Sequence, residues 1–497
     1  MQLKARDSLF LSERLVTNRL GQYWSVYAPD VPGMPVVMNG VAFSILKSFE
    51  GGGRVCDALA RPIADSKLEI EDAVSCVNHF VKRGFVGKNT KVCLYEPVDF
   101  VRPSDINSFG VWLHLTNKCN LTCPYCFVDK NAASMSDDVI LDVANNILDS
   151  SIKNNISKIE LRLAGGEPTL VLDKAKFLLD KLYSGIDKQK TKLEVVLLSN
   201  GTLVTNKLIR FLKQYGVGIS ISLDGFGAAH DLCRKRKKSE SGTWELIKEN
   251  ISILKSNGVY PYILATISEQ SCATLSQLTE WVLANDLKMK LRIVKEPLNL
   301  LNTNLHEIGG YYKRYTDSLC ASFEDMFQLV EKERYSFRSF SDLTIDNYCF
   351  NKPKYSVRCG IGENYIVIKE NGSIVPCHMG INEKGLKQAD DILLSAQKTI
   401  CISPINRGAN QQETHDCLVC RWFPVCVGGC PMNNLAVTGS LYSKSPLHCF
   451  YEYVIPRYLE AYSRKLLQEA GKSPNQDFYI LDQYAETGTR AHDVKLQ

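Results

Sequence analysis

The chain has 497 residues, of which 45% are hydrophobic and 23% are charged. This composition is typical of folded globular proteins and excludes a disordered or collagen-like chain. Lys and Arg outnumber Asp and Glu by 59 to 54, an excess too small to indicate nucleic-acid binding by itself. The sequence contains no run of about 18 apolar residues that would span a membrane, and its N-terminus lacks the apolar core of a signal peptide. We therefore expect a cytoplasmic protein of about three domains.

The 18 cysteines are the most informative part of the composition. Nine disulfides are not expected in a reducing compartment. Metal ligation or redox chemistry is the better expectation, and the spacing of the cysteines along the chain tests it.

Residues 1–90 predict a small unit of strands and helices of winged-helix type. The aromatic-rich segment 21–27 predicts a strand, with a hairpin turn at 18–21. A helix is predicted at 41–49, where three glycines follow and stop it. A second helix is predicted at 70–82, where apolar residues recur at helical spacing.

The stretch 91–110 carries prolines and little periodicity, and we interpret it as a linker. Residues 111–335 then alternate strand and helix six times. This rhythm predicts an α/β fold with a parallel sheet and outer helices, either a barrel or a doubly wound sheet. In both folds the active site lies at the carboxyl ends of the strands. The six predicted strands are 111–115, 158–163, 193–198, 217–223, 260–267 and 290–294.

Residues 336–450 are rich in Cys, Gly and Pro and short of periodic apolar runs. Such a segment builds a poor apolar core and needs covalent or metal staples. In the remaining segment 451–497, residues 451–470 predict a surface helix, and the polar tail after it is expected to be partly loose.

A compact cysteine array follows the first strand of the predicted sheet. Cys119, Cys123 and Cys126 form a C-x3-C-x2-C pattern within one loop. A structural zinc site is one interpretation, but it takes four protein ligands, and the nearest downstream cysteine is Cys233. Three ligands leave one position open, and an iron–sulfur cube held at three irons has a fourth iron free for a small molecule.

With this array the sequence resembles the radical S-adenosylmethionine (SAM) enzymes, and the resemblance implies a partial (β/α)6 barrel of the TIM type. It also implies a [4Fe–4S] cluster at the three cysteines, with SAM bound to the unique iron through its amino and carboxylate groups. Reduction by an external one-electron donor of flavodoxin or ferredoxin type then yields methionine and a 5′-deoxyadenosyl radical that abstracts a hydrogen.

Other strand ends agree with this resemblance. Gly165-Gly166-Glu167 follows the second strand, where glycines permit close backbone approach and a carboxylate can accept from an ammonium. It is similar to the GGE motif of the family, which contacts the SAM amino group. By the same resemblance Ser222 and Arg234 match positions that hold the SAM carboxylate and ribose region. Each short motif alone is also consistent with an ordinary βα turn. The predicted SAM contacts are Tyr125, Gly165, Gly166, Glu167, Ser199, Ser222 and Arg234.

A second group of seven cysteines follows, at Cys359, Cys377, Cys417, Cys420, Cys426, Cys430 and Cys449. This pattern resembles the SPASM domain of radical SAM maturases, which carries two auxiliary [4Fe–4S] clusters. The resemblance pairs Cys359, Cys377 and Cys430 in the first of them, with Cys349 as a natural further ligand. The rival interpretation is a pair of zinc sites. The second auxiliary cluster would be held by Cys417, Cys420, Cys426 and Cys449, which brings the implied total to three [4Fe–4S] clusters. The other cysteines are expected to pack as small apolar residues.

His378 directly follows Cys377. In sulfatase-maturing relatives the corresponding residue is an acidic catalytic base. A histidine can also accept a proton near neutral pH, so we name His378 as the candidate catalytic residue. The alternative is a hydrogen-bonding residue beside a cluster.

The N-terminal unit resembles the PqqD-like peptide-recognition element that is fused to maturases of ribosomally made peptides. Such elements bind a leader peptide as an added strand on an exposed sheet edge. The alternative is a DNA-binding winged helix, which is disfavoured because the helix at 70–82 carries Glu71 and Asp72 instead of a basic face.

These motifs together predict a radical SAM oxidoreductase that modifies a precursor peptide and binds neither nucleic acid nor membrane. The expected product is a thioether or carbon–carbon cross-link. A sulfatase-type maturase that oxidises Cys or Ser to formylglycine is the second enzyme hypothesis. A zinc-loaded, non-catalytic adaptor for peptide or DNA is the alternative from another class.

Overall fold

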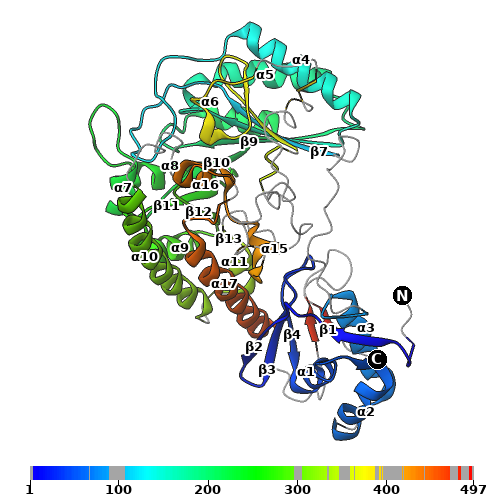
Figure 1. Cartoon of the computed structure of the whole chain (residues 1–497). Coiled ribbons are helices and arrows are strands. Elements are labelled where there is room, and N and C mark those ends of the chain that lie inside the picture. Colours follow the sequence, from blue (N-terminus) through cyan, green and yellow to red (C-terminus); the bar gives the residue numbers. More distant parts are fainter. Residues whose placement is uncertain are drawn as a thin grey trace.

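The computed structural model of the chain is drawn in Figure 1. Cys349 and most of the predicted linker lie outside the residues that it describes. The described residues are 4–66, 68–88, 107–295, 305–332, 335–345, 359–362, 364–386, 391–392, 395, 417, 419–441, 443–470, 480–482 and 492–494.

The N-terminal unit is built from two small antiparallel sheets and three helices. Its main strands are β2 (Val16–Leu20), β3 (Tyr23–Tyr27) and β4 (Val36–Asn39), and its helices are α1 (Gly40–Lys47), α2 (Val55–Ser66) and α3 (Ile70–Lys82). The second sheet joins β1 (Ser8–Leu11) to β5 (Gly53–Arg54) and β6 (Val86–Gly87). The helix predicted at 70–82 is confirmed. Helix α2 was not predicted, because Pro62 lies within it and a proline inside a helix normally breaks it.

The predicted hairpin is confirmed, but its turn lies further along the chain than the predicted 18–21. Asn18 and Arg19 belong to β2 and pair with Ser25 and Trp24 of β3. The turn begins instead at Gly21, whose φ of +66° is a left-handed conformation that glycine adopts without steric cost.

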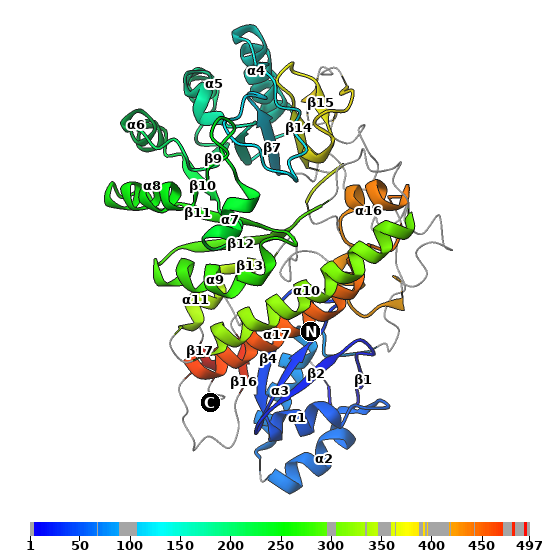
Figure 2. The ribbon, with the colours of Figure 1, turned by 90° about the vertical axis from the view of Figure 1, so that its left-hand side faces the viewer.

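The central sheet confirms all six predicted strands, with ends shifted by up to three residues. They are β7 (Ser108–His114), β8 (Lys158–Ala164), β9 (Lys192–Ser199), β10 (Gly218–Ser222), β11 (Tyr262–Ile267) and β12 (Lys288–Ile293). Neighbouring strands of this group run parallel. Their connections include α4 (Asp137–Lys153), α5 (Leu172–Gly185), α6 (Asn206–Tyr215), α7 (Ala228–Cys233), α8 (Trp244–Ser256) and α9 (Leu275–Ala284). Figure 2 shows α4, α5, α6 and α8 following one another along the outer side of the sheet.

Alternation along each strand explains this arrangement. On β7, Phe109, Val111 and Leu113 are buried in the main hydrophobic core, whereas the intervening residues are only half-buried. Side chains of a strand alternate between the two faces of the sheet. One face is therefore sealed by the helices, and the other remains available on the inner side.

The cysteine-rich segment contributes strands to both edges of the central sheet. Strand β13 (Leu343–Ile345) pairs parallel with β12, and β14 (Tyr365–Ile368) pairs parallel with β7. Strand β15 (Ile374–Val375) then pairs antiparallel with β14, so the sheet has nine strands in the order β13-β12-β11-β10-β9-β8-β7-β14-β15. The short helices α11 (Phe337–Ser341), α15 (Phe423–Cys426) and α16 (Pro431–Thr438) also belong to this segment.

The helix predicted at 451–470 is present, but its predicted position at the surface is wrong. Helix α17 (His448–Glu469) lies beside the long helix α10 (Leu305–Glu331) and ends next to the N-terminal sheet (Figure 1). Arg457 binds Glu324 and Glu331 of α10 at 2.9 and 2.6 Å. Ser463 on the other side hydrogen-bonds Ser25 of β3 at 2.8 Å. The helix is buried because it packs on two partners that are distant in sequence.

Two short strands lie in the tail. Strand β16 (Ile480–Asp482) pairs antiparallel with β4, and β17 (His492–Val494) pairs with β16. None of the described helices is long and apolar enough to cross a membrane.

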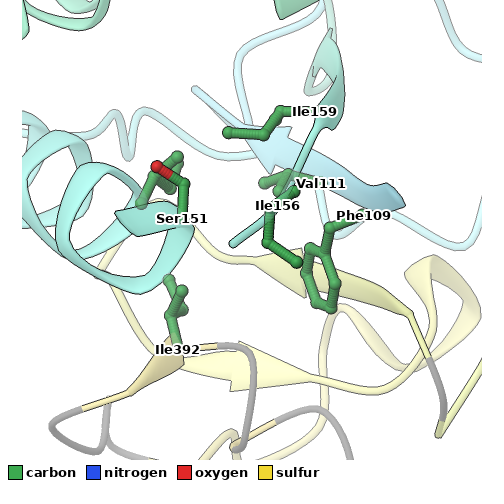
Figure 3. A pocket seen from close by; sticks show the side chains of 7 residues that line it. Phe109, Val111, Ser151, Ile156, Ile159 and Ile392 are labelled. Atoms are coloured by element: carbon green, nitrogen blue, oxygen red, sulfur yellow. The ribbon is translucent and has the colours of Figure 1, made fainter. Parts of the chain in front are cut away.

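A small apolar pocket lies between α4 and the amino-terminal part of β7 (Figure 3). Ile392 of the cysteine-rich segment closes it, and Ser151 supplies a hydroxyl. Asp391, next to Ile392, accepts from Asn154 at 3.0 Å and pairs with Lys153. The pocket therefore marks where this segment packs against the sheet, away from the carboxyl ends of the strands.

Candidate active site at the carboxyl ends of the strands

The first cysteine array lies in the loop that leaves the carboxyl end of β7. Burial raises the pKa of the Cys119 thiol, and raises that of Cys123 to about 11. All three cysteines are half-buried, and the N–H of Cys126 donates to the carbonyl of Cys123 at 3.2 Å. The N–H of Leu121 donates to Sγ of Cys119 at 3.5 Å.

Two glycines after β8 join the neighbouring strand end to this loop. The N–H of Gly166 donates to the carbonyl of Thr116 at 2.6 Å. A Cβ on Gly165 would lie 2.5 Å from that carbonyl oxygen, and one on Gly166 would lie 2.3 Å from the carbonyl oxygen of Lys118. Both distances are shorter than atomic contact allows. Glycine is therefore required here by the close approach of two backbones.

Glu167 is fully buried at the same turn. One carboxylate oxygen accepts from the N–H and hydroxyl of Thr169 at 3.1 and 2.6 Å and from the hydroxyl of Ser199 at 2.9 Å. The other oxygen accepts from the N–H of Asn200 at 2.7 Å. Burial raises the pKa of Glu167, and these donors oppose that rise. Glu167 therefore connects the end of β8 to the end of β9 through its hydrogen bonds with Ser199 and Asn200.

An ion pair between Asp224 and Arg234 occupies the end of β10. Nε of Arg234 donates to Asp224 at 2.7 Å, and Nη1 donates to Sγ of Cys123 at 3.9 Å. The guanidinium also lies 5.8 Å from the centre of the Tyr125 ring, whose hydroxyl donates to Asp224. Asp224 further accepts from the N–H of Thr266 on β11 at 2.9 Å. The pair therefore connects the cysteine loop to two strand ends.

The structure brings together most of the predicted SAM contacts. Tyr125 and Arg234 meet at Asp224, a residue that the sequence motifs did not single out. The signal was present, because Asp224 follows β10 two residues after Ser222. Ser222 itself lies half-buried at the end of β10 and pairs with Leu264 of β11.

His230 holds the backbone behind this ion pair. Its Nδ1 accepts from the N–H of Asp224 at 3.2 Å, so the ring proton belongs on Nε2, which lies 3.0 Å from the hydroxyl of Thr243. That hydroxyl donates in turn to the carbonyl of Arg234 at 2.9 Å. Burial lowers the pKa of His230 to about 4, so the imidazole is neutral near pH 7.

The basic run 235–238 pairs with the cysteine loop through its backbone. The N–H of Thr122 donates to the carbonyl of Lys235 at 3.0 Å, and the N–H of Lys237 donates to the carbonyl of Asn120 at 2.8 Å. These bonds pair the run with the cysteine loop and fix the position of that loop.

The later cysteines fall into two neighbourhoods. Cys377 and Cys430 lie in one small apolar cluster, and burial raises the pKa of Cys377. Burial raises the pKa of Cys426 as well, with Cys417 and Cys420 acting on it. Within the described residues no three potential ligands converge closely enough to hold a single metal ion. The cysteines are therefore neighbours rather than a closed coordination shell.

Cys449 lies in the first turn of α17, with its Sγ 3.0 Å from Nε2 of His448. Burial raises the pKa of the Cys320 thiol in α10 to about 11, and the nearby Asp317 and Cys449 add to this rise. Among the cysteines expected to pack as apolar residues, Cys76, Cys233 and Cys272 are buried. Cys56 is exposed, which corrects that expectation for this position.

His378 is enclosed by aromatic rings. Its imidazole stacks on Trp112 at 4.7 Å between ring centres and lies 5.3 Å from Phe127. Burial, reinforced by nearby cationic side chains, lowers its pKa to about 3. These properties disfavour proton acceptance, and the catalytic assignment of His378 stays a prediction.

Residues 113–268 match the family model of the radical SAM superfamily. This protein carries a radical SAM domain. The match spans β8 to β11 and includes the three-cysteine loop and the Gly165–Gly166 turn. Together with the relatives below, it shows that the chain is a radical SAM enzyme, and enzymes of this superfamily use an iron–sulfur cluster and SAM.

Several characterised enzymes are similar to this radical SAM enzyme. The cysteine-type anaerobic sulfatase-maturating enzyme of Clostridium novyi is 25% identical over 330 residues, which cover 64% of this chain and 86% of that enzyme. The radical SAM cyclopropyl synthase TigE of Paramaledivibacter caminithermalis is 27% identical over 219 residues, or 39% of this chain and 45% of that protein.

A solved structure, native anSMEcpe with bound AdoMet and Cp18Cys peptide, shares the fold of this radical SAM enzyme. It superimposes with a TM-score of 0.57 at 20% identity and covers 72% of this chain and 99% of that one.

The residues of the site fit a cluster and SAM. The cysteine loop offers three thiols, which are the ligands that iron–sulfur clusters take. Beside it the two glycines let the backbone after β8 lie directly against the backbone of this loop. The buried guanidinium of Arg234 lies at the same place and can receive a carboxylate.

Proposed function

We propose that this radical SAM enzyme modifies a ribosomally made precursor peptide and forms a thioether or carbon–carbon cross-link in it. The observation that carries the proposal is the joining of Cys123, Arg234 and Asp224 at the carboxyl end of a parallel sheet. The cluster and SAM would together supply a 5′-deoxyadenosyl radical that abstracts a hydrogen from the peptide.

The residues of the chain would divide the remaining work. Cys119, Cys123 and Cys126 would hold the cluster at three corners. The backbone of Gly165 and Gly166 would lie against SAM. Arg234, kept in place by Asp224, would hold the SAM carboxylate region, with Tyr125 and Ser222 beside it. Glu167 and Ser199, which we predicted as contacts to SAM, would also keep two strand ends in register through the hydrogen bonds described above.

The later cysteines would hold two auxiliary [4Fe–4S] clusters. The packing of Cys377 with Cys430 in one small apolar cluster supports the first group. The N–H of Cys420 donates to the carbonyl of Cys417 at 3.1 Å, and Cys426 ends the short helix that follows, which supports the second group, to which we add Cys449. Cys349 would complete the first group and lies outside the described residues. These clusters would supply a place for the electron left on the peptide, whereas an external one-electron donor would supply the electron for SAM cleavage.

The N-terminal unit supports a peptide as substrate. It is a small antiparallel sheet backed by three helices, and such sheets can bind an extended peptide by strand addition. The sulfatase-maturating relative supports a second candidate, the oxidation of Cys or Ser to formylglycine. We favour the cross-linking reaction, because the chain carries an N-terminal unit that would serve as a peptide-recognition element and because His378 stands where the resemblance predicts an acidic residue.

Mass spectrometry tests the proposal. Short peptides encoded beside the gene would be incubated anaerobically with the enzyme, SAM and a reductant, and the Cys123→Ala variant would serve as the control. We expect the loss of two hydrogen atoms from one peptide in a product that an aldehyde-reactive hydrazide does not label. Hydrazide labelling would identify formylglycine and contradict the cross-link. An unchanged peptide without 5′-deoxyadenosine would favour the adaptor and contradict both reactions.

A further inference from the structure

Four consecutive cationic residues, 235–238, follow Arg234 directly and form the basic run described above. Their side chains are exposed, and within the part of the chain that the structure describes none of them forms an ion pair. Glu240 is the single acidic residue between 235 and 241, so this stretch carries a net positive charge. The run belongs to the loop between α7 and α8, which projects at the edge of the molecule (Figure 1).

Several other cations of the central sheet and its helices are neutralised by neighbouring carboxylates. Lys158 and Lys192 both bind Glu194, at 2.9 and 2.7 Å. Lys207 of α6 binds Asp173 of α5 at 2.6 Å. Like charges that stand together repel one another, so the basic run does not stabilise the loop that carries it. A partner of opposite charge would relieve this repulsion.

The backbone of the run is fixed, although its side chains are not. Two hydrogen bonds join it to the cysteine loop, and between them Leu121 and Arg236 form an antiparallel bridge. Within the loop, the N–H of Arg236 donates to the carbonyl of Ser241 at 3.0 Å. The cations are therefore presented to solvent from a constant position relative to the cysteine loop.

The run also lies next to a predicted ligand of the cluster. Thr122, whose N–H donates to the run, directly precedes Cys123 and is exposed. Arg234, at the other end of this contact, donates to Sγ of Cys123 at 3.9 Å. A protein bound on the run would therefore lie within a few residues of the cluster site, and transfer of an electron between two proteins requires such closeness.

We propose that the basic run 235–238 is the docking surface for a reduced carrier protein that has an acidic surface and delivers the electron for SAM cleavage. One electron passes from the carrier to the cluster held by Cys119, Cys123 and Cys126. The carrier is oxidised and the cluster is reduced by one electron, and no bond forms or breaks between the two proteins. Interfaces of electron-transfer partners are small and transient, so complementary charge acts there mainly on the rate of association. The inference requires reduction of the cluster and is independent of the cross-linking reaction.

Binding of an acidic flavodoxin to the full-length enzyme tests the proposal without catalysis. The flavodoxin carries a fluorescent label, and its anisotropy reports the Kd. Lys237→Glu with Lys238→Glu reverses two charges of the run and keeps the backbone bonds that fix it. We expect the Kd to rise about tenfold at low salt. The difference should vanish at about 1 M salt, where the Debye length is about 3 Å.

Lys188→Glu with Lys190→Glu is the matched control. It changes the net charge of the enzyme by the same amount, but both residues are exposed before β9, at the amino end of the sheet. We expect its Kd to equal that of the wild type. An equal loss of affinity in the two double variants would show that net charge alone decides binding, and would overturn the proposal. Lys237→Gln with Lys238→Gln should give a smaller loss and serves if the reversed variant does not fold.

Two reductants separate docking from SAM cleavage. With dithionite, a small reductant that needs no docking surface, all variants should form 5′-deoxyadenosine at the wild-type rate. With reduced flavodoxin at low salt, the reversed run should be about tenfold slower and the control unchanged. A folded run variant that is equally slow with both reductants would overturn the proposal.

The same variants distinguish the carrier from an acidic peptide. If the reversed run bound flavodoxin normally and lost affinity only for the precursor peptide, the run would serve the substrate and the proposal would be wrong. These assays measure flavodoxin binding and 5′-deoxyadenosine, not the modified peptide, so their failure is distinguishable from failure of the proposed reaction.

Discussion

Nη1 of Arg234 lies 3.9 Å from Sγ of Cys123 while Nε of the same guanidinium binds Asp224 at 2.7 Å. A single cation thus connects the cysteine loop after β7 with the carboxyl end of β10. Because the guanidinium and Asp224 are both buried, the contact cannot be exchanged for water without a large cost.

Replacing Asp224 with Asn should leave a buried guanidinium without its counter-charge. We expect the free energy of unfolding, measured by urea denaturation, to fall by about 3 kcal/mol. The SAM concentration that gives half-maximal cleavage should rise as well. Glu245→Gln is the control, because it breaks an exposed pair with Lys248 that contributes less than about 1 kcal/mol. Equal stability of the two variants would contradict a structural role for Asp224.

Replacing Gly166 with Ala should push the turn after β8 away from the cysteine loop, because the new methyl would meet the carbonyl of Lys118. A displacement of about 1 Å can reduce a catalytic rate about a hundredfold. We expect a fall of that order in 5′-deoxyadenosine formation, with less iron bound per chain. Gly40→Ala meets no atom within 4 Å and should leave both quantities unchanged. A fully active Gly166 variant would show that the two backbones need not touch.

The neutral state of His230 should make stability depend on pH. Its pKa falls from 6.5 to about 4 on folding, so between these values the unfolded chain binds a proton that the folded chain does not. The free energy of unfolding therefore falls as the pH is lowered through this window. From pH 7 to pH 5 the contribution of His230 is about 2 kcal/mol. In His230→Gln, urea midpoints should change less over this range; identical pH profiles would refute the assignment.

The ring stacking of His378 on Trp112 indicates a packing role. A general acid or base contributes about a hundredfold or more to a rate. We expect His378→Gln to lower the yield of modified peptide by much less, with 5′-deoxyadenosine formation unchanged. Loss of modified peptide with normal 5′-deoxyadenosine formation would instead support the predicted catalytic role.

Local patterns predicted much of this fold and site. The helix at 70–82 and the six strands have periodic apolar residues, and their detection needs no knowledge of partners. The three-cysteine loop and the Gly165–Gly166 turn could be recognised because their spacing is fixed by the ligand chemistry and by backbone approach.

Features that depend on distant partners were not predictable in this way. Strand β16 has three residues and exists because β4, at the other end of the chain, pairs with it. The burial of α17 likewise depends on α10 and β3. Asp224 was overlooked because an aspartate after a strand is common in turns, and its role becomes visible only when Arg234 and Tyr125 meet there.

The central claim is that Cys123 belongs to a site that cleaves SAM, and quantifying 5′-deoxyadenosine tests it most directly. Wild-type enzyme, Cys123→Ala and Cys56→Ala would be reduced anaerobically in the presence of SAM, with the exposed Cys56 as the matched control. We predict 5′-deoxyadenosine from the wild type and the Cys56 variant and none from the Cys123 variant. Undiminished 5′-deoxyadenosine from Cys123→Ala would contradict the account.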